Sequence, residues 1–325
     1  MLYFLRRTGY FLPILLGVNI VVFTMFFIVN SPDDMARQFL GDKASTPEQI
    51  ERWKSARGYD RPLFINTERS FPAILTDTIF FRKSIAMFWG EFGNTDHTNL
   101  PIAHEIRRRL LPSFCLALPI FLFSTAINIF TAMKLADRRN TAADRAGQLF
   151  CVIMMSISTL ILIIFGQYLA AGLLRIAPAS GFEHGSAMPR FLILPIFIGI
   201  IATAGAGIRL YRTFFLEQLG QDFVRTARAK GLSENRVLFK HVLRNALLPI
   251  LTNIPGCLLG LFTGNMLLEE FFNIPGLGGF TIDAIAAQDF ATVRAMVFLG
   301  AVIYIAGLLL TDLAYSIADP RIRLQ

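Results

Sequence analysis

The sequence predicts an all-α integral membrane protein with six transmembrane helices and an external subdomain between the first and second helices. Of its 325 residues, 54% are hydrophobic and 17% are charged, whereas soluble domains carry about 25% charged residues. The apolar residues form long runs of the length needed to cross a bilayer, roughly 20 residues. Since no stretch alternates apolar and polar residues as a barrel strand does, the spans are expected to be helices.

Six apolar runs are long enough to span the membrane. In chain order they are Tyr10–Val29, Leu110–Met133, the stretch between Arg145 and Arg175, Phe191–Ile208, Asn245–Leu268 and Ala295–Ile317. The third run is longer than a span requires, so it is expected to tilt or to continue past the membrane. No small-residue cleavage site follows the first run, which predicts an uncleaved first helix.

Basic residues in the loops predict the orientation of the chain. They gather at both termini, in the loop after the second run and in the loop after the fourth run. The positive-inside rule places these four segments in the cytoplasm, with both termini. The loop from Glu269 to Asp289 holds four acids and no Lys or Arg, so it is expected outside.

The same topology divides the chain into three parts. Residues 1–30 form an N-terminal transmembrane helix, and residues 31–109 form an external, periplasmic segment that folds as a small subdomain. This segment is rich in basic residues, but long segments translocate largely regardless of their charge. Residues 110–325 form the core transmembrane domain, which contains a cytoplasmic loop at 209–244.

This cytoplasmic loop is polar and carries eight Lys or Arg against three acids. Its part from 218 to 249 reads as two helical pieces joined at Gly231, a residue that can end a helix in the left-handed conformation. Ser233 is a suitable N-cap for the second piece. Ala227 and Ala229 are small, which would let another protein approach the backbone closely. The excess charge favours a docking surface for an acidic partner, with anionic lipid headgroups as the alternative.

The sequence offers few residues for catalysis or cofactor binding. It has no G-x-S-x-G, no H-E-x-x-H and no phosphate-binding G-x-x-x-x-G-K-[ST] motif, so it is not expected to be an enzyme or to bind a metal or nucleotide itself. Nothing indicates nucleic-acid binding. Asp312 is the one acid expected inside a span, and a stand-alone secondary carrier would have to use it. The neutral polar residues expected in spans either hold helices together or line a passage; they include Asn19, Asn128, Gln167, Asn253, Thr263 and Asn265.

Prolines mark the fifth span as the best candidate for a bending element. Pro249 and Pro255 interrupt its helical hydrogen bonding, and Gly256 follows directly. These three residues are the candidate hinge of the transport pathway.

Several motifs together resemble one family of transport proteins. The stretch Phe223–Leu232 is similar to the cytoplasmic "EAA" loop of bacterial ABC-importer permeases, in the wording of the dipeptide/oligopeptide/nickel branch. The likeness continues through Arg244–Pro249 and in the signature Pro275-Gly276-Leu277-Gly278, and it ends at Asp319–Arg323. There are departures: Arg225-Thr226-Ala227 replaces Glu-Ala-Ala, and Ile127–Phe130 replaces glycines usual in the second span.

The resemblance implies a type I ABC-importer permease fold in the bacterial inner membrane. It implies a complex of this chain with a homologous second permease, two ABC ATPase subunits that bind ATP and Mg²⁺, and an external substrate-binding protein. It assigns ATPase coupling to the helix made of Arg225, Thr226, Ala227, Arg228, Ala229, Lys230, Gly231 and Leu232. On this reading the chain forms half of a pathway for peptides or similar small solutes, and the stand-alone carrier is the alternative.

Overall fold

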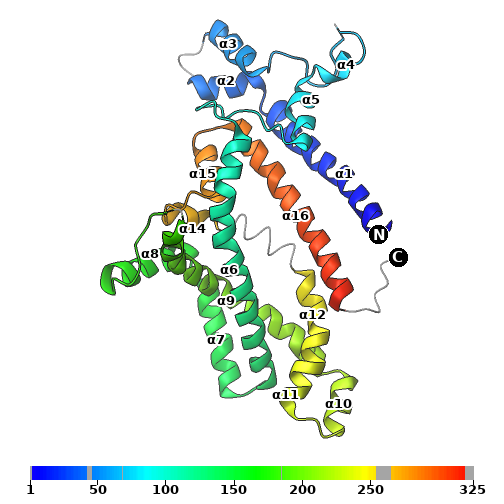
Figure 1. The fold of residues 1–325 in the computed structure, drawn as a ribbon, viewed down its shortest axis with the longest axis vertical. Helices are drawn as coiled ribbons and strands as arrows, with labels where there is room; N and C mark the ends of the chain where they lie inside the picture. The colour runs from blue at the N-terminus through cyan, green and yellow to red at the C-terminus, as the bar shows by residue number, and fades with distance from the viewer. Residues whose placement is uncertain (1, 42–45, 68, 184, 254–264, 319–325) are drawn as a thin grey trace. The chain divides into compact units, whose positions relative to one another are not determined.

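The computed structural model describes residues 2–41, 46–67, 69–183, 185–253 and 265–318 (Figure 1). These residues form helices joined by turns, with a single backbone bridge between Asn94 and Pro101. The all-α character expected from the sequence is therefore confirmed for the described part of the chain.

The chain forms two compact units, each with its own core. The first unit combines residues 1–109 with residues 280–303, and the second combines residues 110–279 with residues 304–325. Three helices contain residues of both units: α6 (Ile102–Asp137), α15 (Leu277–Ala286) and α16 (Phe290–Ala318).

The first unit begins with one long helix, which short helices follow. Its elements before α6 are α1 (Leu2–Phe23), the π-helical η1 (Thr24–Val29), α2 (Pro32–Leu40), α3 (Pro47–Arg57), α4 (Ala73–Thr76), α5 (Ile79–Lys83) and η2 (Ile85–Trp89). The side chains of Ser31 and Thr46 each accept from the backbone N–H three residues on. The side chains of Asp34 and Gln49 in turn accept from the backbone N–H of Ser31 and Thr46, so α2 and α3 both start with a capping box.

Aromatic side chains build the core of the first unit. Phe23 and Phe27 are 0% and 1% exposed, with ring centroids 4.8 Å apart. Tyr59 packs edge-on against Phe27, at 5.3 Å. The segment that follows α1 therefore folds back onto the end of that helix, because burying such rings is strongly favourable.

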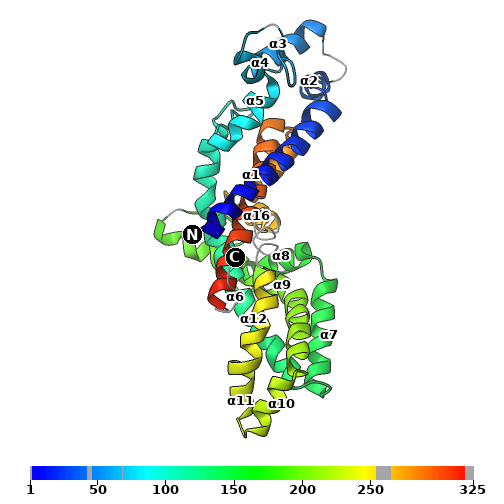
Figure 2. The same ribbon diagram turned by 90° about the vertical axis from the view of Figure 1, so that its right-hand side faces the viewer.

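The second unit is a bundle of long and broken helices. Besides its part of α6, it contains α7 (Ala142–Ser156), α8 (Thr159–Gln167), η3 (Tyr168–Leu173), η4 (Gly185–Ala187), α9 (Met188–Leu219), α10 (Asp222–Ala229), α11 (Glu234–Arg236), η5 (Val237–Val242), α12 (Leu243–Thr252) and α14 (Met266–Phe271). Helices α7 and α9 lie side by side, as both views show (Figures 1 and 2). Gly205 lies against the backbone carbonyl of Cys151 at their contact, which brings the two helices close together.

Four described helices are long and apolar enough to cross a membrane: Phe11–Val29, Ile102–Asp137, Met188–Leu219 and Phe290–Tyr315. A fifth span is possible if α7 and the α8–η3 helix form one broken span, but these two pieces meet at 91°. The third expected span is thus sharply bent rather than simply tilted. Ile157 is extended and Ser158 caps a new helix by accepting from the backbone of Leu160. Much of the expected fifth span, residues 254–264, lies outside the described residues.

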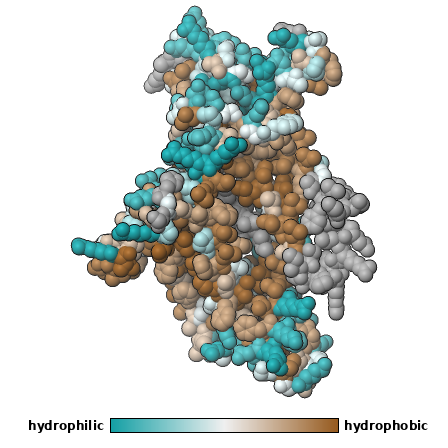
Figure 3. Space-filling view, viewed as in Figure 1, coloured by the Kyte–Doolittle hydropathy of each residue, from teal (hydrophilic) through white to brown (hydrophobic). Residues whose placement is uncertain are grey.

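Large apolar side chains cover the outside of the long helices (Figure 3). On α6, Leu122, Phe123 and Phe130 are each more than half exposed, and on α9 Phe197 is 60% exposed. Hydrophilic residues instead gather over α10 and over the segment of α2 and α3 (Figure 3). A soluble protein rarely exposes so much apolar surface, so these helix faces suit contact with lipid.

Candidate functional site

Helix α10 has one buried face and one exposed basic face. Val224 and Ala227 are 0% and 5% exposed and belong to the core cluster of the second unit. The other face is exposed and contains Asp222, Arg225, Thr226, Arg228 and Ala229, and the C-cap residue Lys230 is exposed as well. The helix is therefore anchored to its own chain through one side and offers a positively charged surface on the other.

The turn after α10 has the geometry expected from the sequence. Gly231 adopts a left-handed conformation with φ +73°, and its backbone N–H donates to the carbonyl of Arg228 at 2.9 Å. The left-handed conformation predicted for Gly231 is thus confirmed. Ser233 stands at the N-cap of α11, as expected, but its side chain makes no capping hydrogen bond.

A side-chain ion pair crosses the same turn. Arg228 of α10 donates from Nε to a carboxylate oxygen of Glu234 in α11 at 3.1 Å. Both side chains are nearly half exposed. The ion pair therefore links α10 to α11 directly, in addition to the backbone of the turn between them.

One expected feature of this surface is wrong. The sequence suggested that both Ala227 and Ala229 would allow a partner to approach closely. The side chain of Ala227 instead faces the core cluster of its own unit, because it lies three positions after buried Val224 and thus on the same helix face. Of these two alanines, only Ala229 is exposed.

The core cluster connects α10 to the following helices. Val237, Leu238 and Val242 of η5 are at most 1% exposed and pack in this cluster with Val224 and Ala227. The π-helical turns of η5 pass directly into α12, which contains Pro249. Pro249 lies inside the helix as expected, whereas Pro255 and Gly256 lie outside the described residues.

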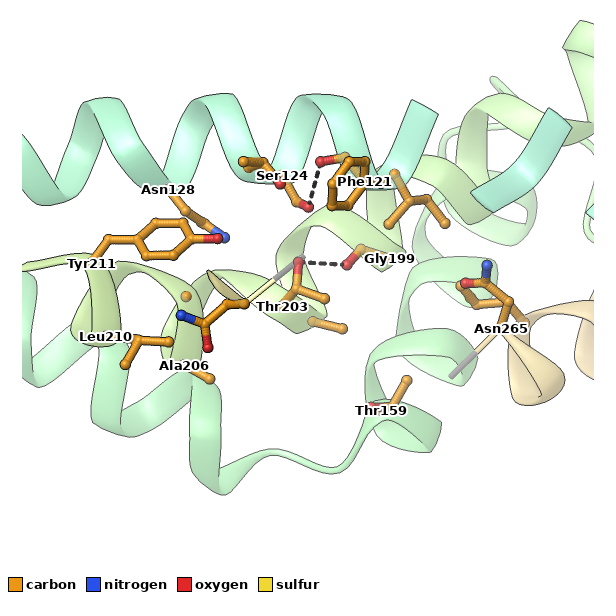
Figure 4. A pocket seen from close by; sticks show the side chains of 16 residues that line it. Phe121, Ser124, Asn128, Thr159, Gly199, Thr203, Ala206, Leu210, Tyr211 and Asn265 are labelled. Carbon is orange, nitrogen blue, oxygen red and sulfur yellow. Dashed lines mark hydrogen bonds between the residues drawn. The ribbon is translucent and has the colours of Figure 1, made fainter. Parts of the chain in front are cut away.

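A cavity of about 470 Å³ opens between α6, α9 and the residues on either side of the 254–264 gap (Figure 4). Its lining mixes apolar side chains with neutral polar ones and contains no charged residue among those the structure describes. The polar members are Ser124, Thr125, Asn128, Thr159, Thr203, Tyr211, Asn253 and Asn265. Neutral hydrogen-bonding groups in a mostly apolar pocket suit a small polar solute.

Two amide groups in this cavity have unused hydrogen-bonding atoms. Asn128 and Asn265 are each 4% exposed. The Oδ1 atom of Asn128 and the Nδ2 atom of Asn265 have no hydrogen-bond partner among the described residues. Buried polar groups are normally satisfied, so these two atoms leave unused hydrogen-bonding capacity in the side chains that line the cavity.

Asn128 occupies space left by a glycine on the facing helix. A Cβ atom at Gly207 of α9 would lie 2.2 Å from the Nδ2 atom of Asn128. Ile120, two turns earlier on α6, lies in the same way against Gly199. Glycines are expected near Ile127–Phe130 from the family resemblance, and at Asn128 the larger side chain that stands there instead fits against a glycine of α9.

Some of the neutral polar residues line the cavity, and others hold helices or loops together. Asn128, Asn253 and Asn265 line the cavity, whereas two others hold helices or loops together. Asn19 donates to the carbonyl of Ser84 at 2.9 Å, and Gln167 donates to the carbonyls of Ala179 and Phe271. Thr263 lies outside the described residues.

The Pro275–Gly278 signature surrounds a buried carboxylate. Glu269 is 2% exposed, and its Oε2 atom accepts from the backbone N–H groups of Gly278 at 2.6 Å and Gly279 at 3.0 Å. Ser113 of α6 donates to Oε1 at 2.6 Å and accepts from the N–H of Leu277. The positive end of the α15 dipole thus meets the carboxylate.

In the sequence, Glu269 stands out only as one of four acids in a loop expected outside. It is instead the residue around which the signature folds, and a Cβ atom at Gly276 would lie 2.2 Å from its carboxyl group. The spacing of an acid seven to nine residues before the glycines is the signal that marks this arrangement, since a carboxylate stabilises a helix start.

Asp312 is buried, with 4% exposure, in α16. It does not line the cavity described above. Among the residues that the structure describes, no cluster of His, Cys, Asp and Glu has an arrangement that could hold a metal ion.

Two known protein families together match nearly the whole chain. Residues 124–324 match the family described as the binding-protein-dependent transport system inner membrane component. Residues 1–117 match the N-terminal family of the same membrane components.

Individual relatives match over nearly their full length. The chain is 33% identical to the dipeptide transport system permease protein DppB of Lactococcus lactis subsp. cremoris, over 96% of this chain and 99% of the relative. It is 31% identical to the glutathione transport system permease protein GsiC of Salmonella paratyphi A, over 99% and 98%. It is also 31% identical to a putative peptide transport system permease protein of Brucella abortus, over 98% of each.

Proposed function

This chain belongs to the family of binding-protein-dependent transport system inner membrane components, and from that premise we propose that it carries short peptides or similar small solutes. It is a multi-pass membrane permease subunit of an ABC importer, and as such it catalyses no covalent reaction itself. The observation that supports a peptide-type solute is similarity over nearly the whole chain to permeases of dipeptide, glutathione and peptide transport systems.

The cavity between α6 and α9 is the proposed passage, or this chain's half of it. Its volume of about 470 Å³ lies in the range of about 300–1,000 Å³ that is typical of small-molecule sites. Asn128 and Asn265 offer one amide acceptor and one amide donor, which match the donor and acceptor of a peptide group. A lining of neutral groups favours backbone recognition over binding of one particular side chain.

Helix α10 is the proposed contact with an ATPase subunit. Its exposed face provides Arg225, Arg228 and Lys230, and its buried face joins the core cluster. Tyr211 belongs to that cluster and also lines the cavity. A displacement of α10 would therefore reach the passage through packed side chains, as expected for a rigid-body switch.

The remaining partners follow the family pattern. An importer permease works with ATPase subunits and a substrate-binding protein, and we propose two ATPases, one homologous second permease and one external binding protein. ATP and Mg²⁺ bind to the ATPases. The chain lies in the bacterial inner membrane with both termini in the cytoplasm, and residues 31–109 face outward; the basic loops support this orientation.

The test of coupling uses Ala229→Trp in the complete complex reconstituted into vesicles with its binding protein. A bulky ring on the exposed face of α10 should block docking, so solute-stimulated ATP hydrolysis and uptake of a labelled dipeptide should both fall at least tenfold. Ala143→Trp is the matched control, because Ala143 is an exposed alanine in the other basic loop expected in the cytoplasm.

Two readouts separate the coupling role from the substrate. Normal uptake by Ala229→Trp would contradict the docking role of α10. A different outcome is that the unaltered complex takes up no peptide while another solute stimulates its ATP hydrolysis. That result would contradict the proposed substrate class but would not contradict the coupling role of α10.

A further inference from the structure

The first unit contains a second cavity, unlike the one between α6 and α9. It measures about 480 Å³, and its lining consists mainly of polar and charged groups from α3, the segment 83–99 and the start of α16. Three cations line it, Arg57, Lys83 and Arg294, against the single carboxylate of Asp96. Transport through the α6–α9 cavity makes no use of this site.

The carboxylate in this cavity is already engaged. Asp96 accepts from Nε of Arg57 at 3.0 Å, and its other oxygen accepts from the backbone N–H of Ala291 at 3.1 Å. Arg57 also donates to the carbonyl of Asp96 and lies over the ring of Trp53, with 4.3 Å between its Cζ atom and the ring centroid. Arg57 and Asp96 therefore balance each other.

Arg294 and Lys83 are left as excess positive charge. Arg294 is 2% exposed, and its Nε atom has no hydrogen-bond partner among the described residues. Its guanidinium lies 5.0 Å from the ring centroid of Phe27, and the ammonium of Lys83 lies 5.3 Å from that of Tyr59. Within the part of the chain that the structure describes, neither cation pairs with a carboxylate.

A buried arginine without a counter-ion is costly, because desolvation of a charge must be offset by pairing. Burial, with the nearby charges of Arg294, Arg61 and Arg57, lowers the pKa of Lys83 to about 8 despite the opposing effect of Asp96. The cavity thus holds net positive charge in a partly dehydrated place. A guanidinium fork matches the paired oxygens of carboxylate and phosphate groups.

We propose that this cavity is a binding site for an oxyanion, a carboxylate or phosphate group, held by Arg294 and Lys83. The neutral groups of Tyr59, Asn94 and Asn99 add hydrogen-bonding capacity to the lining. A bound oxyanion supplies the negative charge that the cavity lacks. The site is independent of the transported solute and of ATPase coupling.

The test measures the reactivity of individual lysines in the complete complex. The complex is placed in phosphatidylcholine nanodiscs and acetylated with limiting isotopic acetic anhydride at pH 7, with sodium phosphate, sodium acetate or sodium chloride at equal ionic strength. Mass spectrometry then reports each lysine. A bound anion that raises the pKa of Lys83 by about one unit lowers its free-amine fraction, and hence its acetylation, about tenfold.

Lys54 is the internal control for this measurement. It lies in the same unit, and ion pairs with Asp33 and Glu51 raise its pKa. Phosphate or acetate should protect Lys83 and leave Lys54 unchanged. Equal protection of both lysines would overturn the proposal, and so would a Lys83 that neither phosphate, nor acetate, nor anionic lipid protects.

A second set of nanodiscs distinguishes two sources of the oxyanion. Phosphatidylglycerol is added to the nanodiscs in chloride buffer. Protection of Lys83 by phosphate and acetate identifies a free anion as the ligand. Protection by phosphatidylglycerol alone identifies a lipid headgroup, and both results support an oxyanion site.

Variants connect the protection to the cavity. Arg294→Gln should abolish protection of Lys83. Since a buried residue is changed there, Asn94→Asp provides a second variant: Asn94 is exposed, and a carboxylate at this position places a competing negative charge in the cavity. Arg52→Gln removes an exposed charge from the same unit outside the cavity and should keep full protection. If phosphate or acetate protects Lys83 as fully in Asn94→Asp as in Arg52→Gln, the assignment of the anion to this cavity is wrong.

Discussion

Glu269 shows how a single side chain can organise a signature loop. Its carboxylate accepts from two backbone N–H groups at the start of α15 and from the hydroxyl of Ser113 on α6. The glycines of the signature are required because the chain passes so close to this carboxylate and to α14. A Cβ atom at Gly278 would lie 2.7 Å from the Cα atom of Met266.

This close approach predicts a difference between two adjacent glycines. Gly278→Ala should destabilise the protein by about 1–3 kcal/mol, because the added methyl group meets backbone that cannot move aside easily. Gly279→Ala should be nearly neutral, since its Cβ would have an ordinary contact of 3.7 Å with Glu270. Thermal unfolding of the two purified complexes provides the measurement, and equal melting temperatures would contradict the account.

A buried ion pair connects the start of α7 to α9. Arg212 donates to the two oxygens of Asp144 at 2.8 and 2.7 Å, and the side chain of Asp144 is 1% exposed. Asp144→Ala should cost about 3–5 kcal/mol, because it leaves a largely buried guanidinium unpaired. The exposed Asp137 is the matched control, and its replacement by alanine should have little effect.

A double replacement tests the cause of that loss. Asp144→Leu combined with Arg212→Met removes both charges and should recover much of the stability. If the double variant unfolds at as low a temperature as Asp144→Ala, the loss comes from packing rather than from the unpaired charge.

At the residue scale, the sequence predicted the features that depend on the backbone conformation of one residue. Gly231 was expected to be left-handed, and it is. The sequence did not predict which side chains are buried by tertiary packing, because residue type alone does not show which face of a short helix lies against the core. Ala227 and Ala229 look alike in the sequence, yet one is 5% exposed and the other lies on the surface.

Among the elements, α10 separates two functions by its two faces. The buried face is structural, and the exposed basic face is the proposed docking surface. Ala227→Trp should therefore lower the melting temperature of the permease itself, whereas Ala229→Trp should leave it unchanged and affect only coupled transport. Overpacking of a core typically costs about 1–3 kcal/mol, and thermal unfolding of the permease without ATPases checks the contrast.

The bent third span shows a limit at the element scale. The run between Arg145 and Arg175 was recognisable as apolar, but its 91° break has neither proline nor glycine. The break lies at Ile157 and Ser158, where an extended residue is followed by a capping serine. Serine is common inside membrane helices, so its presence alone does not predict a new helix start.

At the scale of the whole molecule, hydropathy predicted the helices better than the cores. Four of the expected spans coincide with long described helices. The aromatic core around Phe23, Phe27 and Tyr59 and the two cavities depend on contacts between segments far apart in the sequence. The sequence did not predict that Arg294 lines the cavity of the first unit. A cation near the start of a span is normally interpreted as an anchor at the membrane interface.

Family membership also predicts the behaviour of the isolated chain. A carrier reading would require Asp312 to titrate during transport, whereas a permease subunit requires its ATPases. Asp312→Asn in the complete complex should keep ATP-driven uptake within about twofold of the unaltered complex. Vesicles containing only this chain should show no uptake under a proton gradient. Gradient-driven uptake that is lost in Asp312→Asn would restore the carrier reading.

The contact of Asn128 with Gly207 has a consequence for the divergence of such permeases. The two positions share one volume across α6 and α9, because the amide fills the space that a side chain at 207 would need. A change of side-chain size at one position alone would therefore narrow or widen the cavity that both positions line. Among homologous chains, a larger residue at the position of Gly207 should therefore accompany a smaller one at that of Asn128.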